Sequence, residues 1–227
     1  MRACIHQPNY LPYLGIFNKI KNSELFVVYD IAQYVKDRFD NRNLIKTATG
    51  TQWLTIPLQD KDSFLKRFYE VKLPRDDFWK KDHLRSIKVN YAKVKHFHKY
   101  FPKIKKIYEK NHIFLADFTL DIIKFLMESF KIKTPIVKSR DLNLDLAKKS
   151  TEMIIQILNK VEASEYLAGA SGKNYMDTAA LKMAGIKVKY QHFKHPIYTQ
   201  LFKHPFVKNL AAIDLLFNEG PDAKKYI

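Results

Sequence analysis

RACIHQPNYLPYLGIFNKIKNSELFVVYD, residues 2–30, is the stretch from which the expected architecture of this chain follows. Residues 2–6 predict a short strand, and Gln7-Pro8-Asn9 supplies a turn. Apolar residues between 13 and 20 recur at helical spacing, and residues 25–29 are an apolar run rich in strand formers. This order predicts a βαβ unit, whose parallel sheet has to be covered by helices.

Outside this stretch the same patterns predict further strands and helices. The predicted strands are 53–58, 69–73, a short one opened by Pro135, 166–168 and 188–193; the predicted helices are 79–88, 91–108, 115–130 and 146–160. The expected fold class is therefore α/β, with a mostly parallel sheet covered by helices and a helical middle segment at about 75–135. No repeat or linker marks a boundary, so residues 1–227 are expected to form a single domain.

Composition limits the class of protein. Of the 227 residues, 46% are hydrophobic and 14% aromatic, which is typical of a packed globule and excludes a disordered chain. Cys4 is the only cysteine, so neither an intramolecular disulfide nor a cysteine metal cluster is expected. No signal peptide or membrane-spanning run is recognised, so we expect a cytoplasmic protein, with the inner face of the membrane as an alternative location.

The formal net charge is +17, from 40 Lys and Arg against 23 Asp and Glu. This excess predicts either an anionic partner or merely a lysine-rich solvated surface. Basic residues are densest between 93 and 110, where apolar residues interleave at helical spacing and predict an amphipathic helix, kinked at Pro102 or beginning there. No nucleic-acid motif accompanies the segment, so a nucleic-acid partner remains only an alternative.

The segment from His6 to Tyr10 carries the first candidate chemistry. Its prolines hold a histidine and two amides in a rigid turn, and a histidine there can act as acid or base near neutral pH. The competing interpretation is structural, with His6 closing a strand and Asn9 capping the next helix.

Several segments together resemble the WbqC-like family. His6-Gln7-Pro8-Asn9-Tyr10-Leu11-Pro12-Tyr13-Leu14-Gly15 is similar to the N-terminal signature of that family. Further matches are Asp30, Gln33, Asn41-Arg42-Asn43, Ile45-Lys46, Trp53-Leu54-Thr55-Ile56-Pro57, Tyr166-Leu167-Ala168-Gly169, Gly172, Tyr175, His195-Pro196-Ile197-Tyr198-Thr199-Gln200 and the stretch from Ile213 to Gly220. The matches keep their order from residue 5 to residue 220, and residues 60–150 depart most from the pattern.

The resemblance implies a role in assembling bacterial surface polysaccharide of the O-antigen type. We expect a transferase that acts on a nucleotide-activated or lipid-linked sugar and moves an acyl or aminoacyl group from a donor to a sugar amine. The alternatives are a glycosyltransferase and, from another class, a non-catalytic protein that binds nucleic acid or an anionic surface. The order of elements in residues 2–30 is also similar to the start of HxGH nucleotidyltransferases, but Tyr10 and Tyr13 stand at the two histidine positions.

The matched residues give the predicted site. The catalytic candidates are His6, Asn9, Tyr10 and His195; the substrate-binding candidates are Gln7, Tyr13, Asp30, Gln33, Arg42, Asn43, Lys46, Tyr166, Gly169, Gly172, Tyr198 and Gln200. Arg42 and Lys46 would share one face of a helix and hold a phosphate. No metal or cofactor is expected, and the sequence does not determine an oligomeric state.

Strand ends on one side of a parallel sheet converge. The sequence therefore predicts that one pocket is lined by His6, Asn9, Tyr10, Arg42, Tyr166 and His195.

Overall fold

The computed structural model describes residues 1–36, 38–202 and 205–227. Its larger sheet has the strand order β5-β2-β1-β6-β7. These strands are β1 (Arg2–His6), β2 (Leu25–Val28), β5 (Ile136–Lys138), β6 (Glu165–Ala168) and β7 (Lys187–Tyr190). Neighbouring strands pair in parallel throughout, which confirms the predicted α/β fold class.

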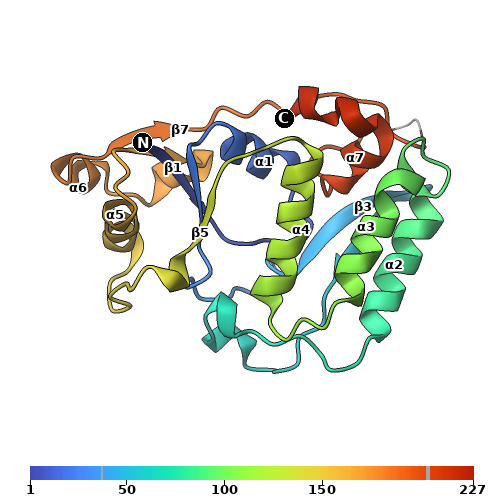
Figure 1. Ribbon diagram of the computed structural model, residues 1–227, viewed down its shortest axis with the longest axis horizontal. Helices are drawn as coiled ribbons and strands as arrows, with labels where there is room; N and C mark the ends of the chain where they lie inside the picture. Colours follow the sequence, from blue (N-terminus) through green and yellow to red (C-terminus); the bar gives the residue numbers. More distant parts are fainter. Residues whose placement is uncertain (37, 203–204) are drawn as a thin grey trace.

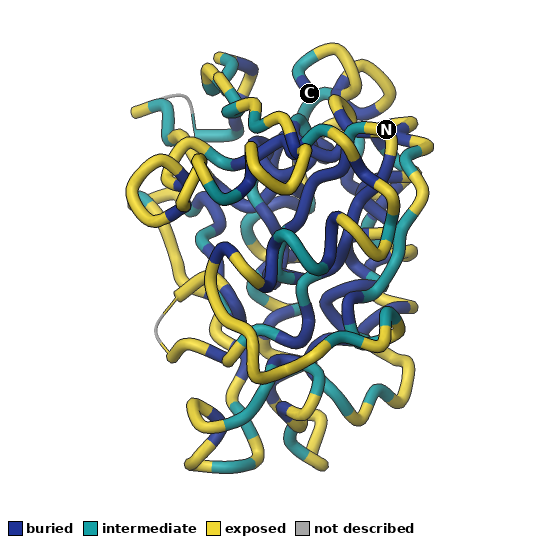
Figure 2. Tube along the Cα trace, turned by 90° about the vertical axis from the view of Figure 1, so that its left-hand side faces the viewer, coloured by how far each residue is buried: buried dark blue, intermediate teal, exposed yellow. Residues whose placement is uncertain are grey.

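Helices cover both faces of this sheet. Successive side chains of a strand point to opposite faces, and in these strands both sets are apolar. Cys4 and Phe26 pack toward α1 (Leu14–Lys21) and α4 (Leu115–Ser129). Ala3 and Leu25 pack toward α5 (Ser150–Lys160) and α6 (Thr178–Met183). Figure 1 shows these pairs of helices on opposite sides of the strands, and Figure 2 shows the buried trace through the middle of the molecule.

A second region lies at the end of the molecule away from α5 and α6 (Figure 1). Here β3 (Arg42–Thr47) and β4 (Gly50–Thr55) form an antiparallel pair of their own, packed beside α2 (Phe78–Tyr91). The helices α3 (Phe97–Glu109) and α7 (Ile213–Glu219) complete this end. The strand predicted at 53–58 therefore forms at 50–55 and in a different sheet.

The prediction of a strand at 69–73 is wrong. Phe68–Glu70 is a short 3-10 turn, in which the Glu70 N–H donates to Arg67 O (2.9 Å), and the Glu70 carboxylate accepts from the Arg67 N–H (2.9 Å). The Phe68 N–H donates to Ala32 O, and Lys72 forms only an isolated bridge with Phe114. Local hydrogen bonds thus end the extended backbone that the residue types favour.

The predicted helical middle is confirmed as α2, α3 and α4. Helix α3 begins at Phe97, so Pro102 lies inside it rather than at its start. Ile104 and Ile107 are buried and Phe101 packs against the core, as the amphipathic pattern predicts, while Lys99 and Lys106 are exposed.

Reversing three exposed lysines of this region, Lys93, Lys99 and Lys106, to Glu should barely change stability. Exposed charges contribute little individually, so the free energy of unfolding should fall by less than about 1.5 kcal/mol. Ile104→Ala is the control in the same helix, because its side chain is 1% exposed and truncation there costs about 2–5 kcal/mol. Urea unfolding measures both variants. A larger loss in the lysine variant would show that this surface takes part in folding.

No helix among residues 1–36, 38–202 and 205–227 is long and apolar enough to cross a bilayer.

Candidate active site

A cavity of about 510 Å³ opens at the carboxyl ends of β1 and β6. Four segments converge on it: the end of β1, the start of α1, the turn after β6 and the chain that follows β7. The lining residues are His6, Tyr13, Gly15, Ile16, Lys19, Gly169, Ala170, Ser171, Gln191, Phe193, His195 and Asn209. This edge of a parallel sheet is where α/β proteins bind ligands.

His6 ends β1 with its ring at this cavity. Its Nδ1 lies 2.9 Å from Gln7 O, and since a carbonyl oxygen only accepts, Nδ1 carries the proton. The Nε2 lone pair is left without a hydrogen-bond partner among the described residues. Burial, and then the charge of Lys19, lowers the pKa of His6 to about 3. The ring is therefore neutral at physiological pH and presents a fixed acceptor.

Lys19 supplies the positive charge beside His6. It belongs to the buried face of α1, is 4% exposed, and donates from Nζ to Ile5 O (3.1 Å). Burial lowers the pKa of Lys19 to about 8, so the side chain is largely protonated at neutral pH. Gln191 closes the other side of α1 by donating from Nε2 to Gly15 O (2.7 Å) and to Asn18 Oδ1 (2.8 Å).

His195 reaches the same cavity from the segment after β7. Its Nδ1 donates to Pro196 O (2.8 Å), which fixes the same tautomer as in His6. Its Nε2 is buried among the rings of Phe193, Tyr198 and Phe206, and no described residue forms a hydrogen bond with it. Burial also lowers the pKa of His195. An unsatisfied buried acceptor costs about 1–3 kcal/mol, and such sites are retained where function uses them.

Gly15 leaves room for the ring of Tyr13 at the mouth of the cavity. A Cβ at position 15 would lie 2.4 Å from Tyr13 Cε2 and 2.7 Å from its hydroxyl oxygen. Tyr13 packs edge-on against Phe193, with 6.4 Å between the ring centroids. The glycine thus fixes where the half-buried phenol stands.

His6 should remain in its Nδ1–H tautomer from about pH 5 to 8, the range in which an unperturbed histidine titrates. Burial and Lys19 depress its pKa to about 3, so protonation begins only in stronger acid. Nitrogen-15 NMR of the imidazole measures this directly. Lys19→Met should raise the pKa of His6, although not to the ordinary value, because burial remains. A His6 that titrates near 6.5 in the unsubstituted protein would contradict this description of the cavity.

Two of the predicted catalytic residues lie outside the cavity. Asn9 is buried and donates from Nδ2 to Asp40 Oδ1 (3.0 Å). The hydroxyl of Tyr10 contacts His83 Nδ1 (2.8 Å) and the hydroxyl of Tyr108, inside the region between α2 and α4. The short loop before α1 turns these side chains inward, so they hold that loop against the core.

Arg42 and Lys46 lie on strand β3, which corrects the helix assumed for them. The Arg42 guanidinium stacks over Trp53, 4.6 Å from the ring centroid. Lys46 is buried and donates from Nζ to Gln200 Oε1 (2.9 Å) and to Pro205 O (3.0 Å). The phosphate grip expected of this pair is therefore not formed at the cavity.

Tyr198 and Gln200 belong to the same buried network as Lys46. Asp214 accepts hydrogen bonds from Tyr91 (2.8 Å), Tyr198 (2.7 Å) and Gln200 (3.1 Å). Asn43, another candidate, donates from Nδ2 to Leu11 O (2.6 Å). These contacts hold residues 198–202 and 205–207, strand β3 and α7 together. Tyr198, Gln200 and Asn43 therefore support the structure around the site.

The remaining candidates are distributed around the sheet. Asp30 is buried after β2, where Oδ1 accepts from Ser139 Oγ (2.8 Å) and Oδ2 lies 2.9 Å from Arg140 Nε. Tyr166 packs in the core beneath α5, and Gln33 lines a different cavity. Gln7 contributes its carbonyl oxygen to His6, and Gly172 lies under Met176, whose Cε would be 2.9 Å from an added Cβ.

Of the predicted residues, the structure brings His6, Tyr13, Gly169 and His195 together at one cavity. Asn9, Tyr10, Arg42 and Tyr166, expected there as well, lie elsewhere. Lys19 and Gln191 are cavity residues that the sequence prediction missed. Lys19 lies on the buried face of α1 together with Ile16 and Ile20. A lysine at a position that helical spacing assigns to the apolar face was the sequence feature that could have indicated a buried charge.

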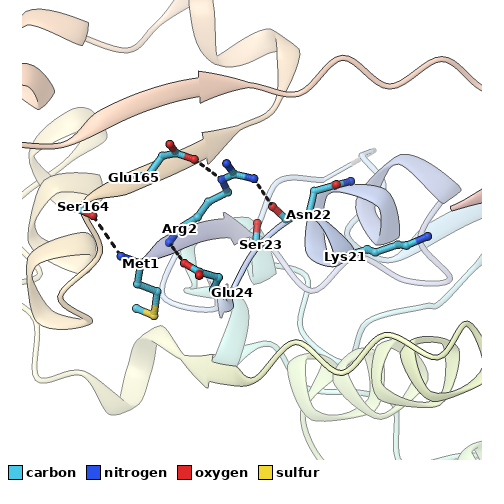
Figure 3. A pocket seen from close by; sticks show the side chains of 8 residues that line it. All are labelled: Met1, Arg2, Lys21, Asn22, Ser23, Glu24, Ser164 and Glu165. Atoms are coloured by element: carbon cyan, nitrogen blue, oxygen red, sulfur yellow. Dashed lines mark hydrogen bonds and ion pairs between the residues drawn. The ribbon is translucent and has the colours of Figure 1, made fainter.

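A separate cavity of about 560 Å³ lies at the amino ends of the strands. Several of its polar groups are paired with one another (Figure 3): the Met1 amino group donates to Ser164 Oγ (3.2 Å) and Arg2 forms an ion pair with Glu165. Because these groups already satisfy each other, this cavity has less to offer a ligand than the one at His6. Within the described ranges no cluster of three His, Cys, Asp or Glu side chains has the arrangement of a metal site.

Comparison with known proteins adds a family. The model of the WbqC-like protein family matches residues 7–226. An uncharacterized protein of Mycobacterium tuberculosis is 32% identical over 228 residues, which span 100% of this chain and 97% of that protein.

Proposed function

This chain belongs to the WbqC-like protein family, and on that premise we propose that it is an enzyme of bacterial surface-polysaccharide biosynthesis. Its substrate is a nucleotide-activated or lipid-linked sugar, and it transfers an acyl or aminoacyl group to the amine of that sugar. The family connects the chain with genes for polysaccharide assembly; the reaction is inferred from the cavity.

The observation that carries this proposal is the tautomer of His6. Because Nδ1–H is committed to Gln7 O, the lone pair of Nε2 is available at the cavity whenever the ring is neutral. Acyl transfer to an amine needs such an acceptor. The amine nitrogen attacks the acyl carbonyl, the new C–N bond forms as the bond to the donor's leaving group breaks, and Nε2 takes the amine proton and returns it to the leaving group.

The charge of Lys19 and the charge of a bound phosphate shift the pKa of His6 in opposite directions. Burial, and then the charge of Lys19, lowers the pKa of His6 and weakens it as a base in the free protein. A substrate diphosphate near Lys19 offsets that charge and raises the pKa of His6 toward the value at which proton transfer is efficient. The base thus gains strength when the substrate is present.

His195 and Gln191 frame the same space. The orphaned Nε2 of His195 is an acceptor for a substrate hydroxyl or amine once the surrounding rings move apart. Gln191 has its amide nitrogen fixed by Gly15 and Asn18, which holds its carbonyl oxygen in a defined direction. We assign these two residues to substrate positioning, with Tyr13 and Phe193 as the apolar walls.

The test uses UDP-linked amino sugars as acceptors and acyl thioesters or aminoacyl esters as donors, with mass spectrometry of the sugar product. The expected result is a mass gain equal to the acyl group on the amine, with the nucleotide diphosphate intact. A product in which the sugar itself has left the diphosphate would overturn acyl transfer in favour of glycosyl transfer. Substituting His6 should abolish most of this product, and His98→Gln, on the exposed face of α3, is the control because it removes a histidine outside the cavity.

A further inference from the structure

A cavity of about 340 Å³ lies on the other side of the sheet from α1, where β2 ends. Tyr29 and Ile31, which follow β2, form one wall, and residues 65–67 and the start of α5 form the others. Its charged lining residues are Lys66, Arg67, Lys148 and Lys149, and no carboxylate lines it among the residues that the structure describes.

The segment that carries Arg67 is held in place by its backbone. Gln33 and Arg67 form an antiparallel bridge, Phe68 N–H donates to Ala32 O, and Tyr34 N–H donates to Lys66 O (2.9 Å). Gln33 also donates from Nε2 to Phe64 O (2.8 Å). The half-buried Arg67 side chain therefore starts from a fixed point and is not a freely moving surface group.

Nearby acidic groups leave most of the positive charge uncompensated. Asp60 pairs with Lys66 (2.5 Å), whereas Glu70 accepts from the Arg67 backbone N–H and Asp145 from the Ala147 N–H. Among the described residues no carboxylate lies within ion-pair distance of the Arg67 guanidinium, which donates from Nη1 to Ile31 O (3.4 Å). Lys148 and Lys149 are exposed beside it.

We propose that this cavity, which we name the β2 anion site (Gln33, Lys66, Arg67, Lys148, Lys149 and Ser150), binds the phosphate or diphosphate group of a phosphorylated ligand. A guanidinium with free donors recognises phosphate oxygens in pairs, and lysines add charge. The first turn of α5 adds partial positive charge from its backbone N–H groups, and the acidic residue of that turn, Glu152, is exposed and is not among the lining residues. The volume is that of a small-ligand site.

The β2 anion site and the cavity at His6 both lie at the carboxyl edge of the sheet, but on opposite faces. Val27 and Ile31 pack with the α5 side, whereas Cys4 and Val28 pack with the α1 side. The two cavities share no lining residue, and the β2 anion site does not depend on the reaction proposed for His6.

The test is calorimetric titration of the whole chain with inorganic diphosphate at about 0.15 M salt, where long-range attraction is screened. Arg67→Gln/Lys149→Gln should weaken binding about ten- to a hundredfold, because charged hydrogen bonds are lost. Lys99→Gln/Lys106→Gln on α3 is the matched control, since it removes the same charge from exposed positions and should change affinity less than about twofold.

Two outcomes would overturn the site: no binding by the unsubstituted protein, or an equal loss in both double variants, which would indicate general attraction to a basic surface. Lys149→Gln alone guards against misfolding, because that side chain is exposed, and a several-fold loss is expected from it. Titrations with UDP and with a short-chain prenyl diphosphate then identify the source of the phosphate, a nucleotide or a lipid carrier. The compound that binds with the lower Kd identifies the ligand class.

Discussion

His6→Gln should lower turnover about 10²–10⁴-fold, the usual contribution of a positioned general base. Glutamine has a similar length and an amide that donates to Gln7 O, so the end of β1 should keep its shape. It has no nitrogen lone pair that accepts a proton. Substrate affinity should change little, so the loss should appear in kcat rather than in KM. Steady-state kinetics with the acceptor sugar varied measures the separation.

The histidine on the other side of the cavity provides the comparison. His195→Gln should raise KM more than it lowers kcat, because we assign His195 to positioning. If His6→Gln keeps full turnover and His195→Gln loses it, then the base is His195 and the assignment is reversed. If both variants keep full turnover, then the cavity is not the place of the reaction.

Asp214→Ala should cost about 3–5 kcal/mol of folding free energy, which is a large part of the stability of an ordinary domain. The carboxylate is fully buried and accepts hydrogen bonds from Tyr91, Tyr198 and Gln200. Burial raises the pKa of Asp214, so holding it ionised already costs free energy at neutral pH. Removing it nevertheless costs more, because two buried hydroxyls and the nearby Lys46 ammonium lose their counterpart.

Chemical denaturation with urea measures this loss, and two variants calibrate it. Asp222→Ala, an exposed carboxylate paired with Lys225, should change stability by less than about 0.5 kcal/mol. Asp214→Asn should fall between the two, because the amide keeps one acceptor oxygen. A cost below about 1 kcal/mol for Asp214→Ala would show that the buried network does not hold Tyr198 and Gln200 in place.

Local periodicity was enough for the elements that it encodes directly. The βαβ unit of residues 2–30 and the three middle helices form where alternation and helical spacing place them, because each pattern describes which side of one segment is buried. The same reasoning placed His6 at the carboxyl end of the first strand. The parallel sheet follows from the connections between strands.

Pairing partners and the fate of polar side chains depended on the tertiary structure. The composition of the residues around Trp53 favours a strand but does not determine which sheet the strand joins. Pairing with β3, which packs beside α2, places it outside the larger sheet. Lys46 and Tyr10 have the residue types of a binding site, but their contacts with Gln200, His83 and Tyr108 bury them. Lys19 has the residue type of a surface, but the end of β1 buries it beside His6. Local sequence fixes which backbone a segment prefers, whereas the surroundings of a charge are set by residues far away in the chain, since burial and hydrogen-bond partners exist only once the segments have packed.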